Sequence, residues 1–309
     1  MDKLITILNI ILPVFIVIAT GWFLNRIRFL SVDVTRALNR FVFYIASPLL
    51  LFKGAAQAAV SGAFNSNLVM IVCIITIATA SLSYILCYRT SPERRGVIVQ
   101  GIYRGNMVYF GLAVVSNAYG DAGIAAAAAI IMVLTPLYNV IAVIVLTIPH
   151  RTSALEFLSA ASMIRGIMLN PLIIGSAAGF LAPTIGLPIP VAIDGSITLL
   201  ARTALPLALI VIGASLDLGA LQGDVKMAFI ASMLKLVALP AAGHLVLSLL
   251  GYEGMALATT TILLASPGAV TSYIMAAEMR GDARLASSII ILTTLLAFIT
   301  ITGWLAYLS

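Results

Sequence analysis

Residues 259–282 read TTTILLASPGAVTSYIMAAEMRGD, an apolar segment that is long enough to cross a bilayer but is interrupted near its middle by Ser266-Pro267-Gly268. Proline removes one backbone donor and disfavours helical geometry at Ser266, and Gly268 has no steric preference of its own. The sequence therefore predicts a helix that parts at this point. Each unpaired backbone group in hydrocarbon costs on the order of several kcal/mol, so the break is tolerated only inside protein or beside a wet cavity.

A second break is predicted in residues 96–118, GVIVQGIYRGNMVYFGLAVVSNA, where Arg104-Gly105-Asn106 falls at a comparable depth. Half-helices that end in mid-membrane are typical of transporters, whose substrates bind at the ends of these half-helices. The alternative interpretation is that each break is a kink that only helps to pack a bundle of helices.

The composition indicates a membrane protein with several spans. Of the 309 residues, 62% are hydrophobic and only 9% are charged, and apolar runs of about 20 residues follow one another. The net charge of +6 does not indicate a nucleic-acid partner, because the basic residues fall in the short links between spans. Cys73 and Cys87 lie in one predicted span, where a helix cannot bring them together in a disulfide.

Ten apolar spans are predicted, in two groups of five. Their approximate ranges are 4–24, 38–58, 67–88, 96–118, 122–147, 166–182, 196–216, 227–250, 255–278 and 284–308. The predicted domains are a first five-helix repeat at 1–147, a cytoplasmic link at 148–164 and a second five-helix repeat at 165–309. Spans 4 and 9 are the two broken ones.

The two groups share an internal repeat. Pro13, Gly21 and Pro48 recur 158 positions later as Pro171, Gly179 and Pro206, and Gly120-Asp121 recurs 161 positions later as Gly281-Asp282. Because each group has an odd number of spans, the second must enter the membrane from the opposite side. The predicted fold class is therefore an all-α polytopic membrane protein with ten transmembrane helices in two inverted five-helix repeats.

Basic residues gather in the links on one side of the predicted membrane. The links after the odd-numbered spans hold Arg26, Arg28, Arg36, Arg40, Arg89, Arg94, Arg95, Arg151, Arg165, Lys226, Arg280 and Arg284, whereas the other side holds Lys3 and Lys53. The positive-inside rule then places both termini on the extracytoplasmic side. The first span has no small-residue cleavage site, so we expect it to be retained.

Three basic residues, Arg104, Arg202 and Lys235, fall within predicted spans, where a charge costs roughly 3 kcal/mol at the centre and is by default a functional candidate. Arg202 and Lys235 lie towards span ends, so we expect their heads to reach the interface, whereas Arg104 adjoins a break and fits either role. No Asp or Glu falls near the middle of a predicted span. Carriers driven by sodium or protons usually keep a buried carboxylate for the coupling ion.

Patterns for catalysis and metal binding are absent from the sequence. His150 and His244 are far apart, there is no H-E-x-x-H, and Gly213-Ala214-Ser215 lacks the last glycine of a nucleophile elbow. We therefore expect no enzyme activity, no metal site and no cofactor.

Five segments resemble the auxin efflux carrier family of permeases. They are LPVFIVIATGWFLNRIRFL in span 1, FVFYIASPLLLF in span 2, GNMVYFGLAVVSNAYGD in span 4, LPLALIVIGASL in span 7 and ASPGAVTSYIMAAEMRGD in span 9. That family includes carriers of malonate and other small organic acids in prokaryotes and the PIN-type auxin exporters of plants. The resemblance implies a scaffold of spans 1, 2, 6 and 7, a mobile transport domain of spans 3–5 and 8–10, and a homodimer formed through the scaffold.

The resemblance also implies that the broken helices cross at mid-membrane, with Asn106 opposite Pro267. The family often has a proline at the crossing in span 4, whereas here Gly105-Asn106-Met107 must unwind without one. Span 4 is therefore expected to be less sharply broken than span 9.

The predicted substrate site lies at this crossing. Half-helices that end there direct N-terminal N–H groups and positive dipole ends towards it, which favours a carboxylate. The predicted substrate-binding residues are Gly105, Asn106, Met107, Ser266, Pro267 and Gly268 at the breaks, with Ser47, Pro48, Tyr138 and Asn139 on spans that border the same cavity. Asn106 and Ser266 are expected to donate to the anion, and Arg104 and Lys235 are candidate charge partners.

Together these features predict a secondary transporter in the bacterial inner membrane that works by alternating access. Its predicted substrate is a small organic anion, exported by uniport under the membrane potential. One alternative is a sodium- or proton-coupled symporter of the bile-acid symporter type, which should add clustered acidic or polar groups behind the crossing. An alternative from another class, an intramembrane sensor or enzyme, lacks a partner-binding extramembrane domain and a nucleophile–base set.

Overall fold

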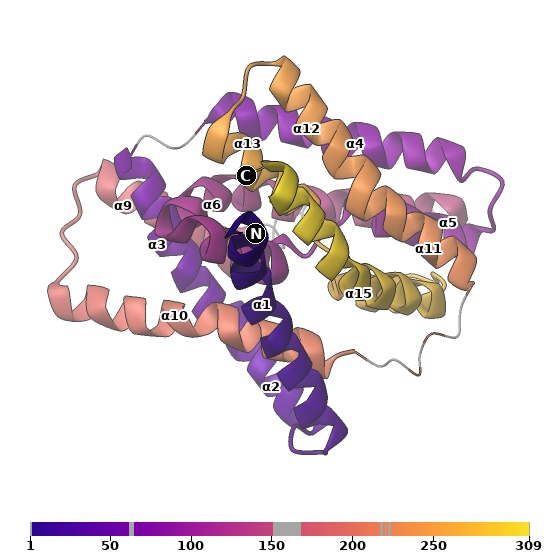
Figure 1. The fold of residues 1–309 in the computed structure, drawn as a ribbon, viewed down its shortest axis with the longest axis horizontal. Coiled ribbons are helices and arrows are strands. Elements are labelled where there is room, and N and C mark those ends of the chain that lie inside the picture. The colour runs from indigo at the N-terminus through magenta and orange to yellow at the C-terminus, as the bar shows by residue number, and fades with distance from the viewer. Residues whose placement is uncertain are drawn as a thin grey trace. The chain divides into compact units, whose positions relative to one another are not determined.

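A computed structural model of the chain describes residues 2–61, 65–150, 168–216, 219, 221 and 224–308. These residues are mostly helical (Figure 1), and the one pairing of extended backbone among them joins Gly105 to Gly268. Most of the predicted link 148–164 lies outside the described residues.

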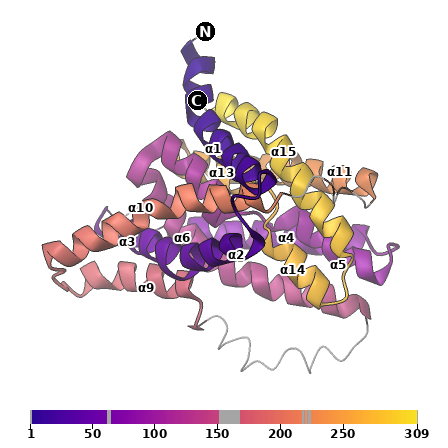
Figure 2. The ribbon, with the colours of Figure 1, turned by 90° about the horizontal axis from the view of Figure 1, so that it is seen from below.

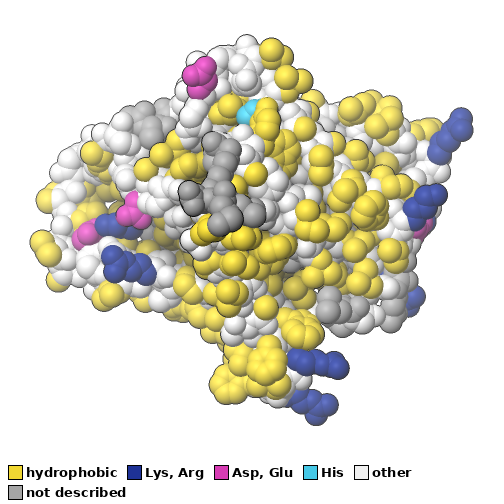
Figure 3. Space-filling view, viewed as in Figure 1, with side chains coloured by type: hydrophobic (Ala, Val, Ile, Leu, Met, Phe, Trp, Pro, Cys, Tyr) yellow, Lys and Arg dark blue, Asp and Glu magenta, His cyan; other side chains and the backbone are white. Residues whose placement is uncertain are grey.

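Seven helices of the described part of the chain are long and apolar enough to cross a membrane. They are Ile5–Arg26, Val32–Ser61, Ser66–Leu86, Met107–Thr147, Val191–Ala214, Val225–Leu249 and Ala283–Leu308, and two shorter apolar helices, Pro171–Thr184 and Gly254–Leu264, accompany them. Hydrophobic side chains dominate the face drawn in Figure 3. The prediction of an all-α membrane protein with several spans is confirmed, whereas ten spans in an inverted repeat stay a prediction.

The chain divides into two compact units, each made of segments that are distant in the sequence. The first unit contains Met1–Val69, Val108–Val133 and Ile167–Leu216, and the second contains Met70–Met107, Leu134–Gly166 and Asp217–Ser309. Both predicted repeats therefore contribute to each unit.

The first unit is held together by close contacts between pairs of helices. Its elements are α1 (Asp2–Arg26), α2 (Val32–Phe41), η1 (Val42–Ala46), α3 (Ser47–Ser61), α9 (Pro171–Thr184), α10 (Val191–Ala214) and the first part of α6 (Leu112–Thr147). Helix α3 packs along α9, and α1 packs against α10 (Figures 1 and 2). Glycine allows these contacts, because a side chain at Gly21 or Gly213 would overlap the facing backbone of α10 or α1. Side chains at Gly175 and Gly179 would overlap the backbone of α3 in the same way.

Proline accounts for two of the irregular turns in the described helices. The π-helical segment η1 directly precedes Ser47-Pro48, and η5 (Leu234–Ala238) precedes Pro240. Because Pro240 has no N–H, the carbonyl of Leu236 loses its helical partner, and the indole N–H of Trp304 donates to it instead at 2.9 Å.

The predicted link between spans 4 and 5, residues 119–121, coincides with a kink inside α6, where two helical segments meet at Gly120. Helix α6 runs from Leu112 to Thr147 through a bend at Gly120, whose φ of 59° and ψ of −147° are open to glycine and strained for other residues. A single glycine is therefore enough to turn the chain at this link.

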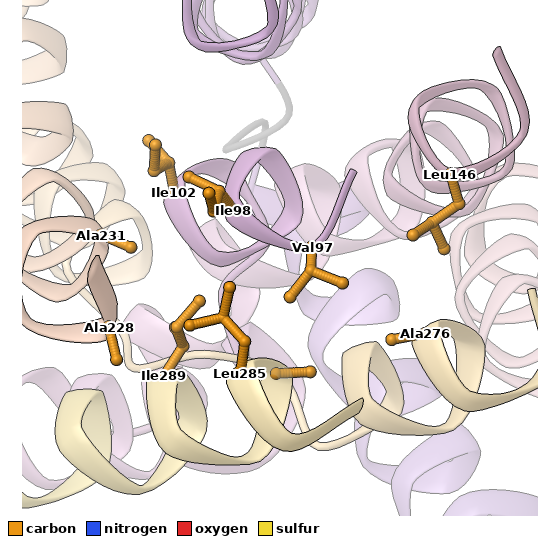
Figure 4. Close-up of a cluster of buried hydrophobic side chains, with 10 residues drawn as sticks. Val97, Ile98, Ile102, Leu146, Ala228, Ala231, Ala276, Leu285 and Ile289 are labelled. Atoms are coloured by element: carbon orange, nitrogen blue, oxygen red, sulfur yellow. The ribbon is translucent and has the colours of Figure 1, made fainter. Parts of the chain in front are cut away.

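The second unit surrounds a core of aliphatic side chains. Its elements are most of α4 (Ser66–Leu86), α5 (Pro92–Tyr103), the end of α6, η3 (Ile148–His150), α11 (Val225–Met233), η5, α12 (Leu239–Leu249), α13 (Gly254–Leu264), α14 (Thr271–Glu278) and α15 (Ala283–Leu308). Figure 4 shows three side chains of α5 facing two of α15: Val97, Ile98 and Ile102 against Leu285 and Ile289. The neighbouring helices contribute alanines, Ala228 and Ala231 from α11 and Ala276 from α14. The small alanines let these two helices approach α5 and α15 closely.

A polar cluster links the ends of three helices in the second unit. Arg94 of α5 contacts Asp224 at 2.9 Å and Asp282 at 3.6 Å, the residues before α11 and α15. Asp224 also accepts from the N–H of Met227 at 3.0 Å, and this bond, with Arg94, holds the pKa of its carboxyl below the usual range. Asp282 accepts from the N–H of Leu285 at 3.0 Å, so both carboxylates also cap a helix.

Candidate functional site

The two predicted breaks lie against each other in the second unit. Helix α5 ends at Tyr103 and the π-helical segment η2 (Met107–Gly111) begins at Met107, while α13 ends at Leu264 and α14 begins at Thr271. The N–H of Asn106 donates to the carbonyl of Pro267 at 2.7 Å, and the N–H of Ala269 donates to the carbonyl of Arg104 at 3.3 Å. The predicted position of Asn106 opposite Pro267 is confirmed. The non-helical stretch is shorter in span 4 than in span 9, and the expectation that span 4 is less sharply broken stays a prediction.

This short antiparallel pairing provides hydrogen-bond partners for backbone groups that the breaks would otherwise leave unpaired. The N–H of Gly268 donates to the Oγ1 of Thr293 on α15 at 3.0 Å, which accounts for a third group. Nothing in the sequence singled out Thr293, because a threonine inside an apolar helix normally bonds to its own preceding turn.

Ser266 has a hydrogen-bond partner at the end of α13. Its hydroxyl is buried and donates to the carbonyl of Leu263 at 2.6 Å. In this conformation the hydroxyl caps the end of α13, and the expectation that it donates to an anion stays a prediction.

Lys235 is the largest departure from the sequence-based expectations. We expected its head to reach the membrane interface, but it lies in η5, well inside the helix that runs from Val225 to Leu249, and its side chain is 0% exposed. Its ammonium donates to the carbonyl of Leu264 at 2.8 Å. A Cβ placed on Gly105 would lie 2.8 Å from the same nitrogen, so Lys235 reaches the crossing itself.

Arg104 directly precedes Gly105 in the backbone pairing and is 6% exposed. Its guanidinium donates to the Oδ1 of Asn139 at 2.6 Å and contacts the sulfur of Met275 at 2.8 Å. The neighbouring Tyr103 donates from its hydroxyl to the carbonyl of Tyr138 at 3.0 Å, and the two rings meet edge to face. These contacts fix α5 against the end of α6 and bring the predicted residues Tyr138 and Asn139 to the crossing.

The site therefore holds two buried cationic side chains. Among the described residues, no carboxylate forms an ion pair with Arg104 or Lys235. A buried cation without a carboxylate partner is costly, and it creates a positive potential that an anion would relieve.

The predicted site residues Ser47 and Pro48 belong to the first unit, where Pro48 packs against Gly175. Their place at the substrate site stays a prediction. Met107, by contrast, lies in the second unit, where its sulfur accepts from the hydroxyl of Tyr138 at 3.6 Å.

A small cavity adjoins the crossing where α5, α14 and α15 lie side by side (Figure 2). Its volume is about 10 Å³, and its lining includes Gln100, Gly268 and Ser272. Within the described part of the chain, the amide of Gln100 and the hydroxyl of Ser272 have no hydrogen-bond partner. This volume suits one water molecule and excludes an organic anion, so substrate binding here requires another conformation of the unit.

Helices that are interrupted in mid-span and joined at their breaks are an arrangement typical of secondary transporters. Comparison with known families agrees, since residues 6–305 match the family described as membrane transport protein. The chain belongs to this family, the auxin efflux carrier family that its motifs resemble, and it is thus a membrane transporter by family.

Three relatives align over almost their whole length. A protein of Rhizobium meliloti named "Putative malonate transporter" is 26% identical over 308 residues, which cover 97% of this chain and 95% of the relative. A protein of Methanothermobacter thermautotrophicus named as an uncharacterized transporter is 24% identical over 95% of this chain and 96% of its own. An uncharacterized transporter of Methanocaldococcus jannaschii is 22% identical over an alignment that covers 96% of this chain and 97% of the relative.

Proposed function

We propose that this protein is an alternating-access secondary transporter that moves a small organic anion through the crossing of its two broken helices. The observation that carries this proposal is the pair of buried cations, Arg104 and Lys235, without a carboxylate partner among the described residues. An intramembrane charge costs on the order of 3 kcal/mol, so a bound carboxylate would recover part of that cost. The name of the Rhizobium meliloti relative supports a carboxylate as the transported group.

The backbone at the start of α14 adds donors to this site. The amides of Val270 and Thr271 donate to no other group in the described ranges. They lie at the positive end of the half-helix, four to five residues from Met275, which Arg104 touches. We propose that the carboxylate binds between these amides and Arg104, with Asn106 as a further contact.

The proposed architecture is ten spans in two inverted repeats, with spans 1, 2, 6 and 7 as the scaffold and spans 3–5 and 8–10 as the transport domain. One contact pattern supports the repeat. Gly21 packs against the backbone of Ile210. Gly179, 158 positions after Gly21, packs in the same way against the backbone of Phe52, 158 positions before Ile210. An inverted repeat pairs span 1 with span 7 and span 6 with span 2, as these contacts do. We further propose a homodimer through the scaffold, in a bacterial inner membrane.

The proposed driving force is the substrate gradient together with the membrane potential. An interior-negative potential is worth about 2.3 kcal/mol per charge per 100 mV and drives an anion outward. The net charge moved in a complete cycle is that of the substrate alone, because the resident cations return with the protein. Export by uniport follows.

The test is a flux assay in proteoliposomes that contain the purified protein and labelled malonate. With a potassium–valinomycin potential and no sodium or pH gradient, malonate should accumulate on the positive side and reverse when the potential is reversed. Protein-free liposomes are the control. If accumulation requires a sodium or proton gradient and ignores the potential, the coupled-symport alternative is correct instead.

A further inference from the structure

The carbonyl end of half-helix α13 has an unusual partner. In an unbroken helix the N–H of Gly268 would bond to the carbonyl of Leu264, but Gly268 donates to Thr293 instead. The carbonyl of Leu264 receives the ammonium of Lys235 at 2.8 Å. A side chain from α11–η5–α12 thus replaces the backbone donor that the break removes.

This position is electrostatically suited to a cation. Leu264 is the last residue of α13, so its carbonyl belongs to the negative end of the helix dipole. The ammonium is fully buried and also faces Gly105, and the hydroxyl oxygen of Ser266 lies beside the same glycine. The other charged group at the crossing is Arg104, and no carboxylate of the described residues pairs with either cation.

Secondary transporters commonly coordinate a coupling sodium ion or proton with unwound backbone carbonyls and the C-terminal ends of half-helices. From the geometry we infer that Lys235 is a tethered cation: its ammonium takes the place of a dissociable coupling ion at the end of α13 and holds the crossing in its binding-competent form. This inference rests on the transport function proposed above. It makes Lys235 a positioning residue and predicts transport that is independent of sodium.

The test removes the tether and supplies the cation separately. Lys235→Ala deletes the three methylenes and the amine that propylammonium contains, so propylammonium can replace the missing atoms. Malonate flux is compared in choline, sodium, propylammonium and tetramethylammonium media, the last of which has no N–H to donate. The matched control is Lys53→Ala, because Lys53 is a half-exposed lysine whose partner is Asp194 in the first unit.

Wild-type flux should be the same in choline and sodium. Lys235→Ala should lose about tenfold to hundredfold in flux, the effect of removing a hydrogen bond from a charged group. Propylammonium or sodium should restore a large part of the flux that Lys235→Ala loses, and tetramethylammonium should not. The flux of Lys53→Ala should change with neither propylammonium nor sodium. Wild-type flux that requires sodium would overturn the inference, as would a folded Lys235→Ala that no small cation restores.

Two further measurements keep the inference testable if a variant is unstable or if malonate is not carried. Lys235→Met keeps the length and volume of the side chain without its charge, and wild-type flux in this variant would refute the inference. In the absence of any organic anion, propylammonium should raise the melting temperature of Lys235→Ala and leave that of the wild type unchanged. A wild type that carries no anion would refute the proposed function, while the melting temperatures would still decide whether the cation site exists.

Discussion

Pro267 provides both the interruption of span 9 and, through its carbonyl, the acceptor for Asn106. We predict that Pro267→Ala lowers transport far more than folding yield, by roughly tenfold or more in initial rate. Alanine restores an N–H and is favoured in a helix by about 3 kcal/mol over proline, so the two half-helices should tend to join and close the crossing.

The matched control for this substitution is Pro13→Ala, since Pro13 lies inside the continuous helix α1. Rates should be compared at equal membrane abundance of each variant. Equal transport by Pro267→Ala and wild type would show that the broken geometry is not required for the site.

At single residues, the sequence was informative where the backbone itself is unusual. Ser266-Pro267-Gly268 and Arg104-Gly105-Asn106 were identifiable because proline, glycine and an intramembrane charge are rare in a span. Lys235 and Thr293 were not, because their roles depend on which helix packs beside the break, and that information is not local. The burial of Lys235 also depends on η5, whose wider turn does not follow from a hydrophobic pattern.

The contacts between helices of the first unit depend on glycine at defined positions. We predict that Gly213→Ala destabilises the protein by about 1–3 kcal/mol, because the new methyl group would overlap the carbonyl of Ile18 and force α10 away from α1. Thermal unfolding of the purified variant in detergent measures the effect as a lower melting temperature.

Gly195→Ala is the control on the same helix, since a Cβ there meets no atom within 4 Å. It should leave the melting temperature unchanged or raise it slightly, because alanine is favoured over glycine in a helix by about 0.5–1 kcal/mol. If both variants shift the melting temperature alike, the close approach of α1 and α10 does not contribute to stability.

Helix positions were predictable to within a few residues where an apolar run ends in charge or glycine, as in Ala283–Leu308 against the predicted 284–308. Helix α10 begins at Val191, five residues before the predicted start at 196, because a charged residue such as Asp194 favours a link over a span in a prediction from sequence. In the structure Asp194 lies in the first turn of α10 and pairs with Lys53 at 2.8 Å, so a charge near the end of a span does not mark the boundary.

For the whole molecule, the distribution of basic residues predicts that both termini lie outside the cytoplasm. In a bacterial host, alkaline phosphatase fused after Ser309 should be active, and a green fluorescent protein at the same position should be dark. Phosphatase fused after Thr90, in the basic link that follows α4, should be inactive. A fluorescent C-terminal fusion would contradict the predicted orientation.

The indole of Trp304, which takes over the carbonyl that Pro240 leaves without a donor, gives the protein a built-in optical probe. The chain has two tryptophans, so Trp22→Phe would leave Trp304 as the single emitter. Its acceptor, Leu236, directly follows Lys235 in the chain. The emission wavelength and lifetime of this one indole would therefore register rearrangement of η5 against α15 during the transport cycle, in the unlabelled protein and without an attached dye.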